Sequence, residues 1–308
     1  MVSIDVCNRY YSFACSINEL EDIDGYPHMK RGIMDGGNVI IKELYCDGRR
    51  LDFLESVYST IESIVGVNVP MKHCAGESIL RTECNGVIIF EELKNPDKVV
   101  TAKWWAKILQ AVHSLENFWQ YKEVVIEDYL EEVDALLKSA QNYMESDIRC
   151  SVKQMLNKVN WKLTKKSRLV LNHGDPLCSN VMMKIDKLVL IDFESAKLAP
   201  KEYDIQRKLW DVAIEFDNVN DIIFFLNEFK SEYEKTEGID MELLMELYII
   251  DFCRTFCWLY IVSRDEKRYD YKRQKVECEN FAKAVRDGRI EAVLRYIEKG
   301  VCCDGIKE

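Results

Sequence analysis

The sequence predicts an α+β protein of two lobes, with a β-rich N-terminal lobe over residues 1–94 and a mainly helical C-terminal lobe over residues 95–308. In the first hundred residues, short runs of β-branched and aromatic residues are bounded by Gly, Asn or Asp, as is typical of strands. After Asn95-Pro96-Asp97, apolar residues recur mainly at helical spacing. The change of pattern near residue 95 predicts a hinge between the lobes.

The first lobe is predicted to hold strands on both sides of one helix. The strands are expected at residues 10–17, 38–44 and 86–93. Between the last two, residues 51–65 carry apolar side chains at intervals of three and four, which indicates an amphipathic helix. The order is therefore strands, one helix and then strand again.

The second lobe is predicted to be helical except for two short apolar strands. Helices are expected at residues 101–115, 124–144 and 146–163, and throughout the chain from residue 205. The two strands are expected at residues 169–172 and 188–191, where they would form a hairpin-like unit. Polar residues at the ends of these strands can then converge on one site.

Composition limits the function classes. With 48% hydrophobic and 31% charged residues, the chain resembles an ordinary soluble globular enzyme. Its net charge of −11 makes it a poor general binder of nucleic acid, whose phosphates require clustered Lys and Arg. The acidity suits a cationic substrate and suits solubility alone equally well.

Cysteine usage and the absence of targeting signals predict a cytoplasmic protein. The 12 cysteines are scattered and none forms a C-x-x-C pair, so a zinc site is not expected. Cys253 and Cys257 lie four apart in an apolar helical stretch, which predicts core packing. Residues 1–15 lack a secretory signal, and no stretch approaches the ~18–20 apolar residues of a membrane span. We expect free thiols in a reducing compartment and no membrane association.

The stretch over residues 169–192 carries the chemistry. A short strand leads into His173-Gly174-Asp175, Asn180 follows five residues after Asp175, and a second strand ends at Asp192. Phosphoryl transfer requires a carboxylate near the acceptor hydroxyl and oxygen ligands for Mg²⁺ on the nucleotide phosphates. Asp175 would position or deprotonate the hydroxyl, while Asn180 and Asp192 would hold the metal. Taken singly, each of the three is an ordinary turn, capping or strand-end residue; together they favour a catalytic centre.

These motifs, H-G-D-x-x-x-x-N followed by I-D-F-E, resemble those of the aminoglycoside phosphotransferase and choline kinase family, relatives of the protein kinases. Gly174 and Glu194 stand where protein kinases have Arg and Gly, which favours the small-molecule branch. The resemblance implies a two-lobed protein-kinase-like fold, ATP or GTP with Mg²⁺, and phosphorylation of a small-molecule hydroxyl. It also implies a structural role for His173 and for Asp204 of the Tyr203-Asp204-Ile205 element.

The resemblance extends less sharply into the first lobe. Val39-Ile40-Ile41-Lys42 parallels the V-A-I-K strand, which implies that Lys42 contacts the α and β phosphates. Its usual partner is a Glu on the following helix, and Glu55 is expected there rather than Glu62. Lys42 alone would otherwise be read as an exposed strand lysine.

The strand over residues 86–93 resembles the one that enters the kinase hinge. By analogy, Glu91 and Leu93 would bind adenine through main-chain groups and Phe90 would wall the pocket. The chain has no G-x-G-x-x-G loop before Lys42 and no Walker motif, so the groups covering the phosphates are expected within residues 23–37.

A substrate region is expected in the acidic stretch over residues 215–246, which holds ten Asp or Glu and two Lys. In aminoglycoside-modifying relatives the corresponding helices supply carboxylates for substrate ammonium groups, and such pairs form strong hydrogen bonds. Glu246 and Asp251 are the candidates, with Trp258 or Tyr260 lining the cleft. A solvated helix face is the alternative.

The sequence thus predicts a kinase acting on a small cationic molecule, with an aminoglycoside antibiotic as the first acceptor. Choline, ethanolamine, homoserine and similar metabolites are the alternatives within this class. A kinase fold without activity, serving as a binding protein, is the alternative outside it, and the presence of Asp175, Asn180 and Asp192 argues against it. Neither the acceptor nor the choice of ATP or GTP follows from the sequence.

Overall fold

The predicted α+β class is confirmed by a computed structural model, in which a five-stranded sheet is combined with many helices. The structure describes residues 3–11, 16–82, 85–97, 99–115, 118, 129–159 and 168–299. The chain divides into two units, the first formed by residues 1–99 and 179–196, the second by residues 100–178 and 197–308. Residues 179–196, which the sequence prediction assigned to the C-terminal lobe, therefore pack within the first unit.

The first unit is built on an antiparallel sheet whose strand order is β1-β2-β3-β5-β4. The strands are β1 (Glu19–Ile23), β2 (Tyr26–Ile33), β3 (Val39–Leu44), β4 (Leu80–Arg81) and β5 (Gly86–Glu91). In the central pair, Lys42 of β3 lies opposite Ile88 of β5. The predicted strands at 38–44 and 86–93 are thus observed with slightly shorter bounds.

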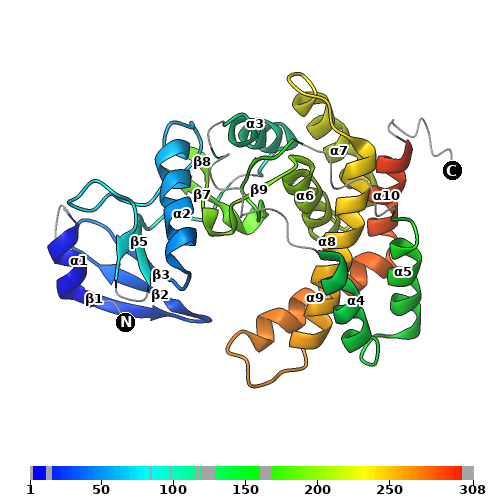
Figure 1. The fold of residues 1–308 in the computed structure, drawn as a ribbon, viewed down its shortest axis with the longest axis horizontal. Helices are drawn as coiled ribbons and strands as arrows, with labels where there is room; N and C mark the ends of the chain where they lie inside the picture. Colours follow the sequence, from blue (N-terminus) through cyan, green and yellow to red (C-terminus); the bar gives the residue numbers. More distant parts are fainter. Residues whose placement is uncertain are drawn as a thin grey trace. The chain divides into compact units, whose positions relative to one another are not determined.

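One helix lies on each face of this sheet (Figure 1). Helix α1 (Ile4–Tyr10) packs through Cys7 on Val39 and Ile41. Side chains alternate along a strand, so Lys42 points to the opposite face. That face is covered by α2 (Gly48–Ile61), whose Leu51 comes close to Gly86. The predicted helix at 51–65 is therefore present, beginning and ending a few residues earlier.

The N-terminal region differs from the prediction. Tyr10 ends α1 instead of beginning a strand, because Ser3 caps a helix by accepting the N–H of Val6 at 3.3 Å. Residues 12–15 of the predicted strand lie outside the described part. The β1–β2 hairpin was missed because Gly32 is the one fully buried residue in its two strands, so apolar alternation is weak.

The two short apolar strands around the catalytic motif do not pair with each other, so the predicted hairpin-like unit is wrong. β6 (Val170–Asn172) pairs with β9 (Lys197–Ala199) in the second unit. β8 (Lys187–Leu190) pairs with β7 (Val181–Lys184) in the first unit. Strands of three or four residues carry too little pattern to identify their partners.

The second unit consists mainly of helices arranged around α8. They are α3 (Ala102–His113), α4 (Tyr129–Ala140), α5 (Ser146–Leu156), α6 (Glu202–Glu215), α7 (Val219–Tyr233), α8 (Met241–Val262), α9 (Tyr271–Arg286) and α10 (Arg289–Lys299). Helix α8 is buried on nearly all sides and packs against α4, α6 and α9 (Figure 1). The predicted helices at 124–144 and 146–163 extend partly into residues outside the described part.

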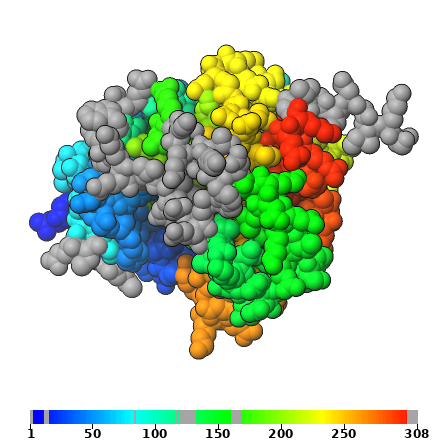
Figure 2. Space-filling view, turned by 45° about the vertical axis from the view of Figure 1, so that its right-hand side comes forward, coloured from blue at the N-terminus to red at the C-terminus, as the bar shows by residue number. Residues whose placement is uncertain are grey.

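The outer surface of the second unit includes α4 and α5, green in Figure 2, next to α10 in red. Lys158, just beyond α5, pairs there with Glu298 of α10 at 3.0 Å. Cys253 and Cys257 are buried in α8 as predicted, and every cysteine in the described ranges is free. No helix among the described residues has both the length and the hydrophobicity needed to cross a bilayer.

Candidate functional site

The loop after β6 carries the predicted catalytic aspartate. Asn172 ends the strand, and His173, Gly174 and Asp175 follow. Gly174 has φ 85°, a left-handed conformation that glycine adopts without a steric penalty, and the chain can therefore turn sharply here. Nδ1 of the buried His173 accepts the backbone N–H of Asp175 at 3.2 Å. The imidazole therefore braces the loop, which is what a structural role requires.

Asp204, in the first turn of α6, binds the backbone of the same loop. Its two carboxylate oxygens accept the backbone N–H groups of His173 at 2.7 Å and of Gly174 at 2.8 Å. Nε2 of His113 lies 3.2 Å from one oxygen, and Nδ1 of this ring contacts the Tyr233 hydroxyl at 2.7 Å. Burial alone would raise the pKa of Asp204, but the His113 contact and the loop amides outweigh it and lower this pKa.

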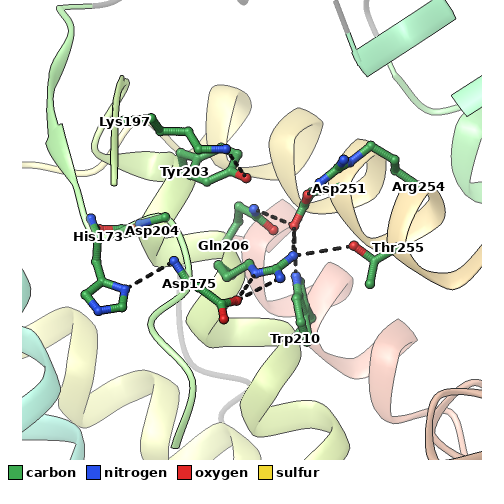
Figure 3. A network of polar contacts seen from close by, with 12 residues as sticks. His173, Asp175, Lys197, Tyr203, Asp204, Gln206, Trp210, Asp251, Arg254 and Thr255 are labelled. Atoms are coloured by element: carbon green, nitrogen blue, oxygen red, sulfur yellow. Dashed lines mark hydrogen bonds and ion pairs between the residues drawn. The ribbon is translucent and has the colours of Figure 1, made fainter. Parts of the chain in front are cut away.

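Asp175 is held by Arg207, a residue outside the predicted site. Figure 3 shows Asp175 near Trp210 and Asp251 in the surrounding polar network. Nε and Nη2 of Arg207 donate to Oδ1 of Asp175 at 3.1 and 2.8 Å. The third nitrogen, Nη1, donates to Asp251 at 3.0 Å and lies 3.4 Å from the Thr255 hydroxyl. One guanidinium group therefore joins the catalytic loop to α8.

The second carboxylate of this network, Asp251, is buried and surrounded by donors. Besides Arg207, its Oδ2 accepts hydrogen bonds from Gln206 at 3.1 Å and from the indole of Trp210 at 3.2 Å, while Oδ1 accepts from Arg254 at 3.1 Å. Burial would raise the pKa of Asp251, but the two arginines and Gln206 lower it far below its usual range. Asp251 is thus a fully compensated buried anion.

The expectation that Asp251 and Glu246 bind a substrate ammonium group is not supported by this arrangement. Each residue is 1% exposed, and the oxygens of Asp251 are already occupied by protein donors. The physical reason is that α8 is buried on nearly all sides, so Glu246 and Asp251 in its middle are removed from solvent. Trp258 is 38% exposed, and its assignment to a substrate cleft stays a prediction.

A second buried cation supports the far end of the loop. Nζ of Lys208 lies 2.5 Å from Asp211 and 3.0 Å from Sγ of Cys178, above the ring of Trp105 at 4.1 Å. Asp211 also accepts the backbone N–H of Cys178 at 3.3 Å. Burial would lower the pKa of Lys208, but Asp211 and Cys178 outweigh it and raise this pKa. Helix α6 therefore holds the loop at both ends.

The residues of α6 that do this share one face of the helix. Asp204, Arg207, Lys208 and Asp211 stand at positions i, i+3, i+4 and i+7, which places them on one side of an α-helix. A charged stripe at this spacing, directly after the Tyr203-Asp204 element, is a signal by which Arg207 and Lys208 could have been found from the sequence.

In the first unit, Lys42 lies among carboxylates of the D-F-E segment. Its ammonium group is 3.2 Å from both oxygens of Asp192 and 2.6 Å from Glu194. Burial would lower the pKa of Lys42, but these two carboxylates outweigh it and raise this pKa. Burial, together with the charge of Asp192, raises the pKa of Glu194 to about 7. One buried ammonium thus faces two carboxylates, and negative charge is in excess.

The expected pair between Lys42 and Glu55 is not formed. The Glu55 carboxylate instead accepts the backbone N–H groups of Ser78 at 2.9 Å and Ile79 at 2.8 Å, just before β4. Arg50, three residues after the α2 cap, donates to the main-chain carbonyl of Glu194. Glu55 therefore ties α2 to the β4 strand, and Glu194 takes the position beside the lysine.

The predicted metal ligands, Asn180 and Asp192, flank the open end of the β7–β8 hairpin. The hairpin pairs Val181 with Leu190, and the carbonyl of Asn180 accepts the N–H of Ile191 at 3.0 Å. Asp192 follows with φ 66° and ψ 62°, a left-handed conformation that is costly for a non-glycine residue and recurs at functional sites. The structure therefore brings Asn180, Asp192 and Lys42 to one region of the first unit, while Asp175 belongs to the second unit.

The donor set in the first unit fits a hard divalent cation bound together with phosphates. Mg²⁺ is commonly held by one or two protein carboxylates plus water and phosphate oxygens. The excess negative charge at Asp192 and Glu194 would be relieved by such a cation. Among the described residues, no three His, Cys, Asp or Glu side chains are grouped to hold a metal alone, so phosphate oxygens would have to complete the coordination.

The predicted adenine-binding residues lie at the end of β5. Phe90 is half-buried and Glu91 is exposed, with its carboxylate 3.3 Å from Lys184. Leu93 follows the strand, and the carbonyl of the next residue, Lys94, accepts the N–H of Met183 at 2.8 Å. The adenine-binding role of all three stays a prediction, as does the hinge near residue 95.

Comparison with known families and structures agrees with the predicted resemblance. The ecdysteroid kinase-like family model matches residues 82–210. No curated protein sequence gives a significant match. An AMP-bound spectinomycin phosphotransferase is 16% identical over 94% of this chain and 96% of its own, with a TM-score of 0.69.

Two further structures extend this comparison. An amicoumacin kinase bound to AMP-PNP, Ca²⁺ and its antibiotic is 15% identical over 89% of this chain and 85% of its own, with a TM-score of 0.57. A choline kinase from Streptococcus pneumoniae is 14% identical over 88% and 94%, with a TM-score of 0.54. The protein-kinase-like fold and the resemblance to aminoglycoside phosphotransferases and choline kinases are confirmed. At such identities the likeness establishes the fold alone.

Proposed function

We propose that this protein is a small-molecule kinase that transfers the γ-phosphoryl group of ATP or GTP to a hydroxyl. The observation that carries the proposal is the contact of Lys42 with Asp192, two residues 150 positions apart in the chain. Together with Asn180 at the same hairpin, they form the cationic and oxygen-rich groups that a nucleotide triphosphate and its metal require. Packing between strands does not by itself require a buried lysine beside these oxygen ligands.

In the nucleotide half of the reaction, Lys42 binds the α and β phosphates, and Asn180 and Asp192 hold Mg²⁺. When bound, the metal neutralises charge on the β and γ phosphates. Phe90 walls the adenine pocket, and the main-chain groups of Glu91 and Leu93 read the base. The carboxylate of Glu194 holds the ammonium of Lys42 in place until the phosphates arrive.

In the acceptor half, Asp175 orients the attacking hydroxyl and accepts its proton as the new oxygen–phosphorus bond forms. The bond from the γ phosphorus to the bridging oxygen breaks in the same step, and the nucleoside diphosphate leaves. Catalysis of phosphoryl transfer rests mainly on positioning and charge stabilisation. The contacts of Asp204 with the loop amides favour this role, because they fix the backbone that carries Asp175.

A hydroxyl-bearing amine of the aminoglycoside type is the first proposed acceptor, supported by the acidity of the chain and by neighbours that bind spectinomycin or amicoumacin. Choline-like amino alcohols form the second group. A neutral polyhydroxylated acceptor, such as an ecdysteroid, is a further candidate. It is favoured by the family model match. It is also favoured by the ion pairs of Asp251 with Arg207 and Arg254, because these already neutralise the carboxylate that was expected to bind an ammonium group.

The test is nucleotide turnover with ATP and GTP and Mg²⁺ against these three acceptor groups. We expect one group to stimulate turnover, and Asp175→Asn to reduce kcat by roughly 100-fold or more, as loss of an essential proton acceptor does. Asp134→Asn, on the exposed face of α4, is the matched control. If wild-type protein binds nucleotide but no acceptor stimulates turnover, the enzyme proposal fails and a binding function replaces it.

A further inference from the structure

We propose that Arg207 is a positioning residue for Asp175, and that Asp251 is the anchor which holds Arg207 in place. The inference rests on the proposed kinase function and adds two residues of the second unit to its working parts. Neither belongs to the nucleotide motifs, and Asp251 receives a role different from contact with substrate.

The guanidinium group of Arg207 binds two carboxylates at once. All three of its nitrogens are engaged: Nε and Nη2 on one oxygen of Asp175, and Nη1 on Asp251. Arginine presents its donors in a rigid planar fork, so two carboxylates bound to opposite parts of the fork are fixed relative to each other. Rotation of Asp175 away from Arg207 would break two charge-assisted hydrogen bonds.

Arg207 itself cannot move freely. Its guanidinium group lies 4.5 Å from the centre of the Trp210 ring, and its side chain is only 16% exposed. Asp251 is held in turn by Gln206, by the Trp210 indole and by Arg254. The Asp175 carboxylate is therefore connected, through Arg207, to Asp251 of the largely buried helix α8. Figure 3 labels Asp175 and Asp251.

The network serves to orient the Asp175 carboxylate. Replacing a buried ion pair with well-packed apolar residues is often neutral or stabilising, so folding stability alone does not explain the network. An oriented carboxylate does require one, since a misplacement of about 1 Å at a reacting group can cost about 100-fold in rate.

The experiment measures kcat and the nucleotide KM for Arg207→Met, Arg207→Lys and Asp251→Asn. We expect kcat to fall about 100-fold in Arg207→Met, with less loss in Arg207→Lys and Asp251→Asn, while the nucleotide KM changes less than about twofold. Arg286→Met, on the exposed part of α9, is the matched control and should behave as wild type. A general loss of folded protein would instead lower the stoichiometry of nucleotide binding in proportion to kcat.

Two further measurements separate positioning from other roles. In Arg207→Ala, millimolar guanidinium chloride should restore part of the lost kcat, and it should restore none in Asp175→Asn. A crystal structure of Arg207→Met should show the Asp175 carboxylate no longer in its wild-type position, a readout that needs no acceptor.

The outcomes are distinguishable. If Arg207→Met keeps wild-type kcat, or if the Asp175 carboxylate stays in place without Arg207, the positioning role is wrong. If wild-type protein turns over no acceptor, the kinase proposal fails, and the crystal structure alone then decides whether Arg207 positions Asp175.

Discussion

Replacing Asp204 by Asn should both destabilise the second unit and slow catalysis. Asp204 accepts two buried N–H groups of the catalytic loop, and hydrogen bonds to a charged group contribute about 1.5–3 kcal/mol each. An asparagine has one acceptor oxygen, so its NH₂ group must face either the N–H of His173 or that of Gly174. Losing one of these bonds and leaving its buried N–H without an acceptor therefore costs about 1.5–3 kcal/mol.

The measurement is urea unfolding of Asp204→Asn beside kcat. Asp134→Asn is the matched control, because Asp134 forms an exposed pair with Lys138 on one helix and should change stability by about 0.5 kcal/mol or less. Asp204→Asn with wild-type kcat and a loss below about 1 kcal/mol, a single ordinary hydrogen bond, would refute the role assigned to Asp204.

The same variant has a pH signature. Because the pKa of Asp204 is lowered on folding, its ionised form contributes stability that is fully present above the unfolded pKa of about 3.9. This contribution is lost as pH falls through the lower folded pKa. Wild-type stability should therefore decline more steeply than that of Asp204→Asn as pH falls below about 4. Parallel curves would contradict the sign of the shift.

Three other substitutions test the remaining contacts. Lys42→Met should lower kcat/KM for the nucleotide by about 100-fold, as loss of a phosphate-binding charge does, and unchanged steady-state kinetics would exclude that role. Glu55→Gln should leave the nucleotide KM within about twofold but lower the unfolding free energy by about 1–3 kcal/mol, because the side chain keeps a single acceptor oxygen for the amides of Ser78 and Ile79. Lys208→Met leaves Asp211 buried without its cation and should cost about 3–5 kcal/mol by urea unfolding; a neutral result would mean that the pair is not needed.

Strands and helices with a strong apolar pattern could be predicted from the sequence, because burial of one face imposes a period. The strand holding Lys42 and the helix after it were located within a few residues. The β1–β2 hairpin and strands β7 and β9 were not predicted, because short or exposed strands carry little apolar alternation.

The types of residue at the catalytic motif were also available from the sequence. Asp175, Asn180 and Asp192 stand at a spacing that predicted phosphoryl transfer, and Gly174 pointed to the small-molecule branch. The contacts of each side chain could not be predicted from the sequence. Glu55 was expected beside Lys42, yet the structure puts Glu194 there, because a contact between residues far apart in the chain depends on where two strands and a helix pack.

The charge network around Asp175 likewise depends partly on the sequence and partly on the tertiary structure. The spacing of Asp204, Arg207, Lys208 and Asp211 on one helix face is a property of the sequence, readable from the helical period alone. Whether those charges face solvent or a buried partner is decided by the neighbouring helices. Only the tertiary structure brings Asp251 of α8 to Arg207, where burial surrounds this candidate substrate ligand with protein donors.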